Sequence, residues 1–180
     1  NNISYAAYVR ALPESSGQVL VDPSLKVELF FKDGLKGPAT SMAFLAPDDI
    51  LVLEKNTGKV QRIVNGSLEQ NPLLQVKVGT EVELGMLVIA ISKNQQGKTF
   101  VFLYYTEADS SGIVIANRLY RYELIDNKLV NPLLLLNLPA TSPILGHENN
   151  HNGGKVVIGP DNNVYLVIGD VGGRMGNIQN

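Results

Sequence analysis

The sequence predicts an all-β protein that forms part of a β-propeller, and three observations lead to this prediction. The apolar segments are short and rich in β-branched residues, and Gly, Pro, Asn and Asp separate them. No stretch sustains the 3.6-residue apolar period of an amphipathic helix. Similar segments also recur at an interval of ~57–60 residues, which suits the four short strands of a propeller blade.

Two pairs of matching segments define the repeat. Met42–Leu53 and Val156–Val167 each read as an apolar run, a Pro-Asp turn and a second apolar run, and their prolines lie 113 positions apart. Leu68–Leu74 and Leu129–Leu134 each contain Asn-Pro-Leu-Leu, and their prolines lie 60 positions apart. Since half of the first interval is close to the second, both pairs fit one period.

This period predicts about two and a half four-stranded blades in one partial propeller domain over residues 1–180. The blades are expected near 39–78 and 84–138, with an incomplete one from 154, and the segment 25–31 is expected to form a strand of a closing blade. Such a sector leaves long open sheet edges, which soluble proteins avoid. We therefore expect the missing half of the propeller, or a partner chain, to cover them. The alternative is an irregular β-sandwich with accidental repeats.

Composition excludes several kinds of partner. The chain carries 15 basic and 17 acidic residues without a basic stripe, so nucleic acid is not expected to bind. No apolar run approaches the roughly 18 residues of a membrane-spanning helix. The low charge, together with Asn-x-Ser triplets at Asn2 and Asn65, suits an extracytoplasmic protein, secreted, periplasmic or at the cell surface.

The two histidines, His147 and His151, lie close together in the sequence. They match the H-E-x-x-H pattern, which binds zinc only when a helix places both imidazoles on one face. Nearby Pro143 and Gly146, the internal asparagines and the following Asn-Gly-Gly do not favour a helix. The sequence instead places His151 in a loop just before a strand.

Several segments occur along the chain in the same order as in a known family. They are His151–Asp161, Tyr165–Gly173, Glu83–Ala90, Leu103–Thr106 and Asn117–Tyr122. Together they resemble the quinoprotein glucose/sorbosone dehydrogenases, over roughly residues 25–180. One departure is that a valine stands in the third of these segments where the family usually has glycine.

The resemblance implies a six-bladed propeller that oxidises the anomeric hydroxyl of an aldose and passes hydride to pyrroloquinoline quinone. An external electron acceptor then reoxidises the quinone, and calcium is a second cofactor. By resemblance His151 is the catalytic base, Glu83 and Asn150 contact the sugar, and Asp170 and Gly172 line the cofactor. A histidine suits this role because much of it is neutral at pH 7.

The family's quinone-binding arginines and lysine, and its calcium ligands, have no counterpart in this chain, so they are expected beyond Asn180 and no metal ligand is assigned here. Glu83 and His151 each precede the innermost strand of a blade, and 169–173 joins the second and third strands of one. These loops should converge on one face of the propeller, where such folds bind ligands. The rival functions are a non-catalytic extracellular propeller module that binds protein or glycan, and a structural piece that assembles through its open edges.

Overall fold

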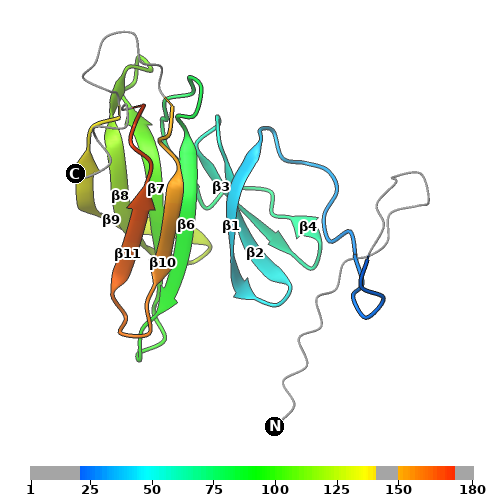
Figure 1. Ribbon diagram of the computed structural model, residues 1–180. Coiled ribbons are helices and arrows are strands. Elements are labelled where there is room, and N and C mark those ends of the chain that lie inside the picture. The colour runs from blue at the N-terminus through cyan, green and yellow to red at the C-terminus, as the bar shows by residue number, and fades with distance from the viewer. Residues whose placement is uncertain (1–20, 141–149, 173–180) are drawn as a thin grey trace.

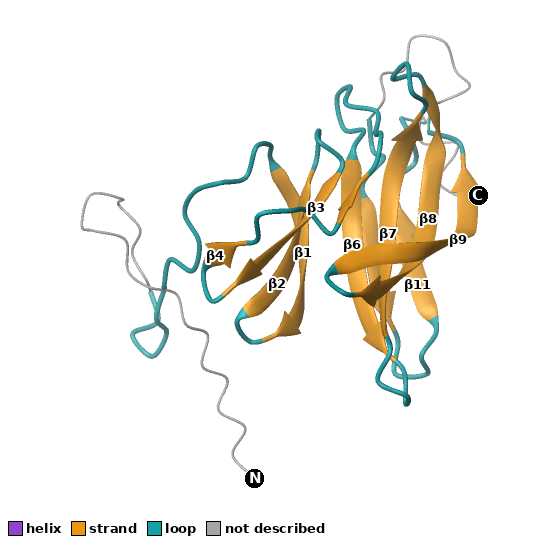
Figure 2. Ribbon diagram, turned by 180° about the vertical axis from the view of Figure 1, so that it is seen from behind, coloured by secondary structure: helices purple, strands orange, loops and turns teal. Residues whose placement is uncertain are grey.

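A computed structural model describes residues 21–140 and 150–172, and these residues form strands and loops without a helix (Figure 2). The eleven strands in these two ranges make three antiparallel sheets. The prediction of an all-β chain is therefore confirmed. No helix long and apolar enough to cross a membrane occurs in the part of the chain that the structure describes.

The first sheet has the strand order β1-β2-β3-β4, and β5 pairs with β3 beside β4. Its bounds are β1 Ala39–Ala46, β2 Asp49–Glu54, β3 Lys59–Val64, β4 Ser67–Leu68 and β5 Leu74–Gln75. These strands lie within the predicted blade range 39–78. Strands β1, β2 and β3 are each followed by a tight turn, so the next strand pairs beside each of them.

The second sheet has the order β6-β7-β8-β9, and the third is the hairpin β10-β11. Their bounds are β6 Met86–Lys93, β7 Thr99–Ala108, β8 Val114–Ile125, β9 Lys128–Leu138, β10 Gly154–Ile158 and β11 Val164–Ile168. The Pro-Asp turns that begin at Pro47 and Pro160 join β1 to β2 and β10 to β11, the same position in the first and third sheets. The repeat in the sequence thus reflects a repeated hairpin.

The three sheets pack face to face, with the β6–β9 sheet between the other two (Figure 1). Strand β6 contacts β1 on one side and β10 on the other, so the first strand of each sheet is the innermost. One apolar core joins the first and second sheets through buried side chains such as Leu51, Leu53, Met86 and Leu103. A second core, around Tyr104 and Val156, joins the second sheet to the hairpin.

The prediction of a strand at 25–31 is wrong, because these residues have no strand pairing. Phe30 and Phe31 instead pack their rings against a small core of Ile50, Val52 and Ile63 on the outer face of the first sheet. The apolar pattern therefore reports side-chain burial, but no neighbouring strand among the described residues offers the backbone a ladder.

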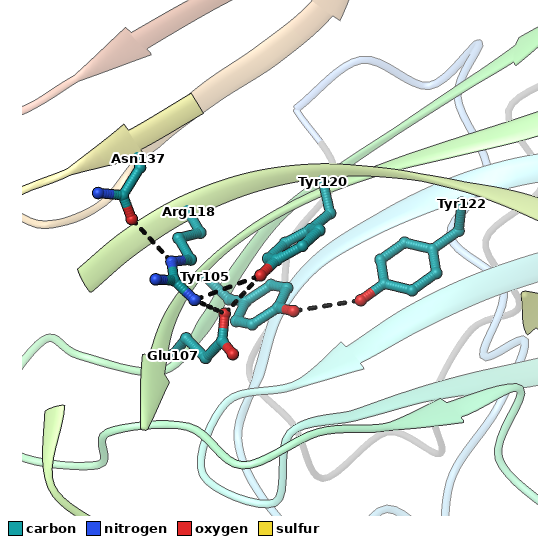
Figure 3. Close-up of polar contacts among 6 residues, drawn as sticks. All are labelled: Tyr105, Glu107, Arg118, Tyr120, Tyr122 and Asn137. Atoms are coloured by element: carbon teal, nitrogen blue, oxygen red, sulfur yellow. Dashed lines mark hydrogen bonds and ion pairs between the residues drawn. The ribbon is translucent and has the colours of Figure 1, made fainter. Parts of the chain in front are cut away.

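Strands β7 and β8 present polar side chains on both faces, because successive residues of a strand point to opposite sides. On the face toward the first sheet, Glu107 accepts hydrogen bonds from Arg118 and from the Tyr120 hydroxyl at 2.9 and 2.7 Å (Figure 3). On the same face the hydroxyls of Tyr105 and Tyr122 lie 3.1 Å apart. The opposite face, toward the β10–β11 hairpin, carries Thr106 and Asn117, which hydrogen-bond to each other.

Candidate active site

Three loops meet at one end of the inner strands. Glu83 lies just before β6, His151 just before β10, and Asp170 just after β11. In the β10–β11 hairpin, Gly154 pairs with Ile168, so the residues that precede one strand lie beside those that follow the other. This antiparallel pairing brings His151 next to Asp170, although 19 positions separate them.

The backbone and the side chain of His151 are both held. Its backbone N–H donates a hydrogen bond to Oε2 of Glu83, and its carbonyl accepts one from the N–H of Val171 at 3.4 Å. Its ring atom Nδ1 lies 2.7 Å from Oδ1 of Asp170. The His151 side chain is 60% exposed and that of Asp170 only 21%. One edge of the imidazole is therefore anchored while the rest stays open to a ligand.

The surrounding charges favour the protonated imidazole. The hydrogen bond to Asp170 raises the pKa of His151 above its usual value, and the negative charges of Asp170 and Glu83 act in the same direction. When the ring is neutral, an Nδ1–H that donates to Asp170 leaves the lone pair on Nε2. The pair Asp170–His151 thus has the arrangement of an oriented general base.

His151 has an unusual backbone conformation. His151 has a φ of 58°, in the left-handed region that residues with a side chain seldom adopt. A side chain at Gly169 would begin 2.2 Å from the His151 carbonyl oxygen, so only glycine allows the two loops to approach this closely. Contacts on both sides of His151 hold it in this conformation, as is common at functional sites.

The structure also places the other predicted residues. Asn150 is half-buried, and its carbonyl accepts a hydrogen bond from the side chain of Asn152 at 3.2 Å. Gly172 is buried and has a φ of 74° in the turn after Asp170. Their contacts with sugar or cofactor stay predictions. His147 and Gly173, which belong to the sequence motifs, lie outside the described residues.

Two buried asparagines at this site were missed by the sequence analysis. Asn117 on β8 and Asn152 beside His151 are both fully buried and hydrogen-bonded to each other. The one available signal was a polar residue inside the apolar pattern of β8, and it did not indicate a partner 35 positions away. Among residues 21–140 and 150–172, no three potential metal-ligating acidic or histidine side chains cluster together.

Comparison with known proteins gives the site its context. Residues 35–180 match the model of the family described as "Glucose / Sorbosone dehydrogenase". The chain belongs to the glucose/sorbosone dehydrogenase family. This confirms the resemblance drawn from the sequence motifs. The comparison with curated proteins found no significant match.

Solved structures have a similar fold. The PQQ-bound form of an aldose sugar dehydrogenase from Streptomyces coelicolor is similar at 25% identity with a TM-score of 0.62, covering 78% of this chain and 40% of that one. Two glucose dehydrogenase structures, 22% and 21% identical, each have a TM-score of 0.60; both alignments cover 79% of this chain, and 39% and 42% of the respective structures. The chain thus corresponds to part of a dehydrogenase propeller and spans about two fifths of the solved chains it matches.

Proposed function

We propose that this chain supplies the catalytic base of a quinoprotein sugar dehydrogenase that oxidises the anomeric hydroxyl of an aldose. The observation that carries the proposal is the exposed His151 imidazole with Nδ1 on Asp170 and its backbone N–H on Glu83. Membership of the glucose/sorbosone dehydrogenase family supplies the reaction class.

In this proposal Nε2 of His151 takes the proton of the anomeric hydroxyl. Asp170 holds the ring in the tautomer that has its lone pair on Nε2, and stabilises the imidazolium that forms. Asp170 was predicted as a cofactor residue, and the contact with His151 supports an orienting role in addition. The oriented base takes this proton while the anomeric carbon, which carries the hydroxyl, loses hydride.

Glu83 has two tasks in the proposal. Its Oε2 accepts the hydrogen bond of the His151 backbone, which secures the loop. The other carboxylate oxygen remains to accept a hydrogen bond from a sugar hydroxyl, as predicted. Asn150 directly precedes His151 in the chain and would contact the same sugar. A carboxylate acceptor suits a sugar because hydroxyls are donors and charge-assisted hydrogen bonds are strong.

When bound, pyrroloquinoline quinone supplies the two-electron acceptor, and the described residues suit its reacting face. Nothing lies within 4 Å of where a side chain at Gly153 would begin, so a flat group can approach the loop. Gly172, in the turn after Asp170, would line the same face. The charged side chains that contact His151 are carboxylates, so in this proposal other residues of the complete protein supply the cations that hold the quinone anion.

Calcium, an external electron acceptor and an extracytoplasmic location complete the proposed function. Calcium and the acceptor rest on the family resemblance, and the location rests on the low charge and the Asn-x-Ser triplets of the sequence. The family relative in the PQQ-bound form supports the cofactor. A non-catalytic propeller that binds a glycan or protein remains the rival function, and one experiment separates the two.

The complete protein is loaded with pyrroloquinoline quinone and calcium, and dye reduction is measured with a panel of aldoses. Turnover with at least one aldose, strictly dependent on the quinone, is expected. Sugar binding by calorimetry without turnover in quinone-loaded protein would favour the binding module. The same assay with ketoses and alditols, which lack an anomeric hydroxyl on a terminal aldehyde carbon, provides the substrate control.

A further inference from the structure

A chain of three buried polar side chains leads from the middle of the second sheet to the loop of His151. The Thr106 hydroxyl on β7 donates to Oδ1 of Asn117 on β8 at 2.6 Å. Nδ2 of Asn117 donates to Oδ1 of Asn152 at 2.6 Å. Nδ2 of Asn152 donates to the carbonyl of Asn150 at 3.2 Å. The chain ends on the residues that flank His151 on both sides.

The direction of these hydrogen bonds is fixed by the groups at each end. Asn117 Nδ2 also donates to the carbonyl of Pro139 at 3.3 Å, which can only accept. The amide of Asn117 must therefore point its nitrogen toward Asn152 and its oxygen toward Thr106. Asn152 must in turn present its oxygen to Asn117 and its nitrogen to the Asn150 carbonyl. All three side chains are fully buried, so water cannot replace a lost partner and each loss leaves an unsatisfied group.

The chain is connected to the catalytic loop through a short stretch of backbone. Asn152 directly follows His151, and the carbonyl of the next residue, Gly153, accepts the N–H of Gly169 at 3.0 Å. Any displacement of the Asn152 side chain would move the backbone of His151 against Glu83 and Asp170. A residue with a left-handed backbone depends on such external contacts, because its own conformation is unfavourable.

We propose that Asn152, held by Asn117 and Thr106, is a positioning residue that fixes His151 against Asp170 from the neighbouring sheet. The inference rests on the proposed function for its catalytic consequence, but not for its structural content. Its effect is exerted through the His151–Asp170 contact, which has a readout of its own. That readout is the pKa of the His151 imidazole, which Asp170 and Glu83 raise.

The main test replaces Asn117 with leucine in the complete protein. This removes the Nδ2 donor to Asn152 and the Oδ1 acceptor of Thr106, and it changes no residue of the His151 loop. Nuclear magnetic resonance titration of the His151 ring, assigned by comparison with His151→Gln, is carried out without cofactor. In Asn117→Leu the pKa is expected to fall toward the ordinary value of 6.5, because the contact with Asp170 loosens. In loaded protein kcat should fall by about 10–100-fold with little change in KM, as a misplaced base predicts.

Thr106 provides a milder pair of variants in case Asn117→Leu does not fold. Thr106→Val removes the hydroxyl at nearly constant shape and leaves Oδ1 of Asn117 without its donor. Thr106→Ser keeps the hydroxyl. Thr106→Val should lower both the His151 pKa and kcat, as Asn117→Leu does. Thr106→Ser should keep both at the wild-type values. A purely apolar packing role for Thr106 would give the reverse ranking.

Gln61→Leu is the matched control. Gln61 is also a buried amide, and it donates to Oε1 of Glu54 in the first sheet at 3.1 Å. Its replacement should lower stability without changing the His151 pKa. An unchanged pKa in folded Thr106→Val, or an equal shift in Gln61→Leu, would overturn the inference. If the wild-type protein bound quinone but oxidised no aldose, the proposed function would fail while the titration still tested the positioning.

Discussion

The proposed catalytic role of His151 depends on an exposed ring held by Asp170 and a backbone N–H held by Glu83. Removing a general base typically costs about 10²–10⁴-fold in rate. His151→Ala in the complete, quinone-loaded protein is therefore expected to lower kcat by at least about a hundredfold, measured by dye reduction under saturating aldose.

His147, the other histidine of the sequence, is the natural comparison. His147→Ala should leave kcat within a few-fold of the wild type, as predicted from its position farther from the strand. Quinone content is measured by absorbance in both variants, so that a loss of cofactor is not taken for a loss of base. Reversed effects in the two variants would remove His151 from the site.

The contact of Asp170 with His151 predicts how kcat depends on pH. Because its hydrogen bond raises the pKa of His151, the neutral ring needed for proton abstraction is lost as the pH falls through that raised value. Asp170→Asn should move the acid limb of the kcat profile to lower pH and reduce its plateau, since an amide holds the ring less well. The stability that the Asp170–His151 pair contributes depends on pH in the opposite direction to kcat. It is present at low pH and is lost as the pH rises through the pKa of His151 in the folded protein.

The pH profile of kcat, recorded together with thermal unfolding at each pH, checks both statements. Asp49, which pairs with Arg62 in the first sheet, offers a control carboxylate away from the base, and Asp49→Asn should leave the acid limb in place. A limb that stayed at the wild-type pH in Asp170→Asn would separate Asp170 from the titration of His151.

The sequence predicted which residues gather at the site better than it predicted their contacts. Motif order and the position of loops before inner strands were enough to bring Glu83, His151 and Asp170 together. The contact of Asp170 with the imidazole depends on the register of the β10–β11 hairpin, which no motif states. Asn117 and Asn152 were invisible because their pairing depends on how two sheets pack.

Among the connecting segments, the end of β11 has the tightest constraint. A side chain at Gly169 would begin 2.2 Å from the His151 carbonyl oxygen, a backbone atom that cannot move without moving His151. Gly169→Ala is expected to destabilise the protein by about 1–3 kcal/mol, the usual range for overpacking, and to lower kcat. Denaturant unfolding and the dye assay on the same preparation measure the two effects.

Gly153→Ala is the matched glycine control, because a side chain there would meet no atom within 4 Å. Its unfolding free energy should change little, whereas its affinity for the quinone should fall if the flat group lies over this loop. Equal losses of stability in the two variants would contradict the tight approach of the two loops at Gly169.

At the level of strands, the sequence predicted most of the sheets, because hairpin turns are a local signal. The Pro-Asp turns and the apolar runs beside them located the hairpins β1–β2 and β10–β11, and the predicted blade range 84–138 contains β6 to β9. The error at 25–31 has a physical cause, since Phe30 and Phe31 satisfy an apolar pattern by packing alone. Strand pairing requires a neighbour, and a single sequence segment does not reveal whether one is present.

The molecule as a whole exposes apolar side chains at both ends of its three-sheet stack. Met42 and Phe44 on β1 are 58% and 56% exposed, and Tyr165 and Val167 on β11 are 50% and 68% exposed. Exposed apolar patches on sheet faces usually mark surfaces that another element covers. These faces suit the packing of further blades or a partner chain.

A protein of these 180 residues alone is expected to oxidise no aldose, even with pyrroloquinoline quinone and calcium. The base has no acceptor to work with when the cofactor is not held, and an unheld cofactor gains nothing from a placed base. Dye reduction measures activity, and analytical ultracentrifugation measures the self-association expected from the exposed faces. Clear turnover by this chain would place the cofactor-binding residues within it.

The hydrogen-bonded chain from Thr106 to Asn152 also bears on the order in which the protein assembles during synthesis. Strands β6–β9 pair only with their neighbours in sequence and are complete at Leu138, before residue 151 leaves the ribosome. Domains generally form from the N-terminus as the chain emerges, and local hairpins form early. The second sheet would then present the Asn117 side chain as both donor and acceptor before the His151 loop is made. That loop would acquire its shape when it docks onto the completed sheet.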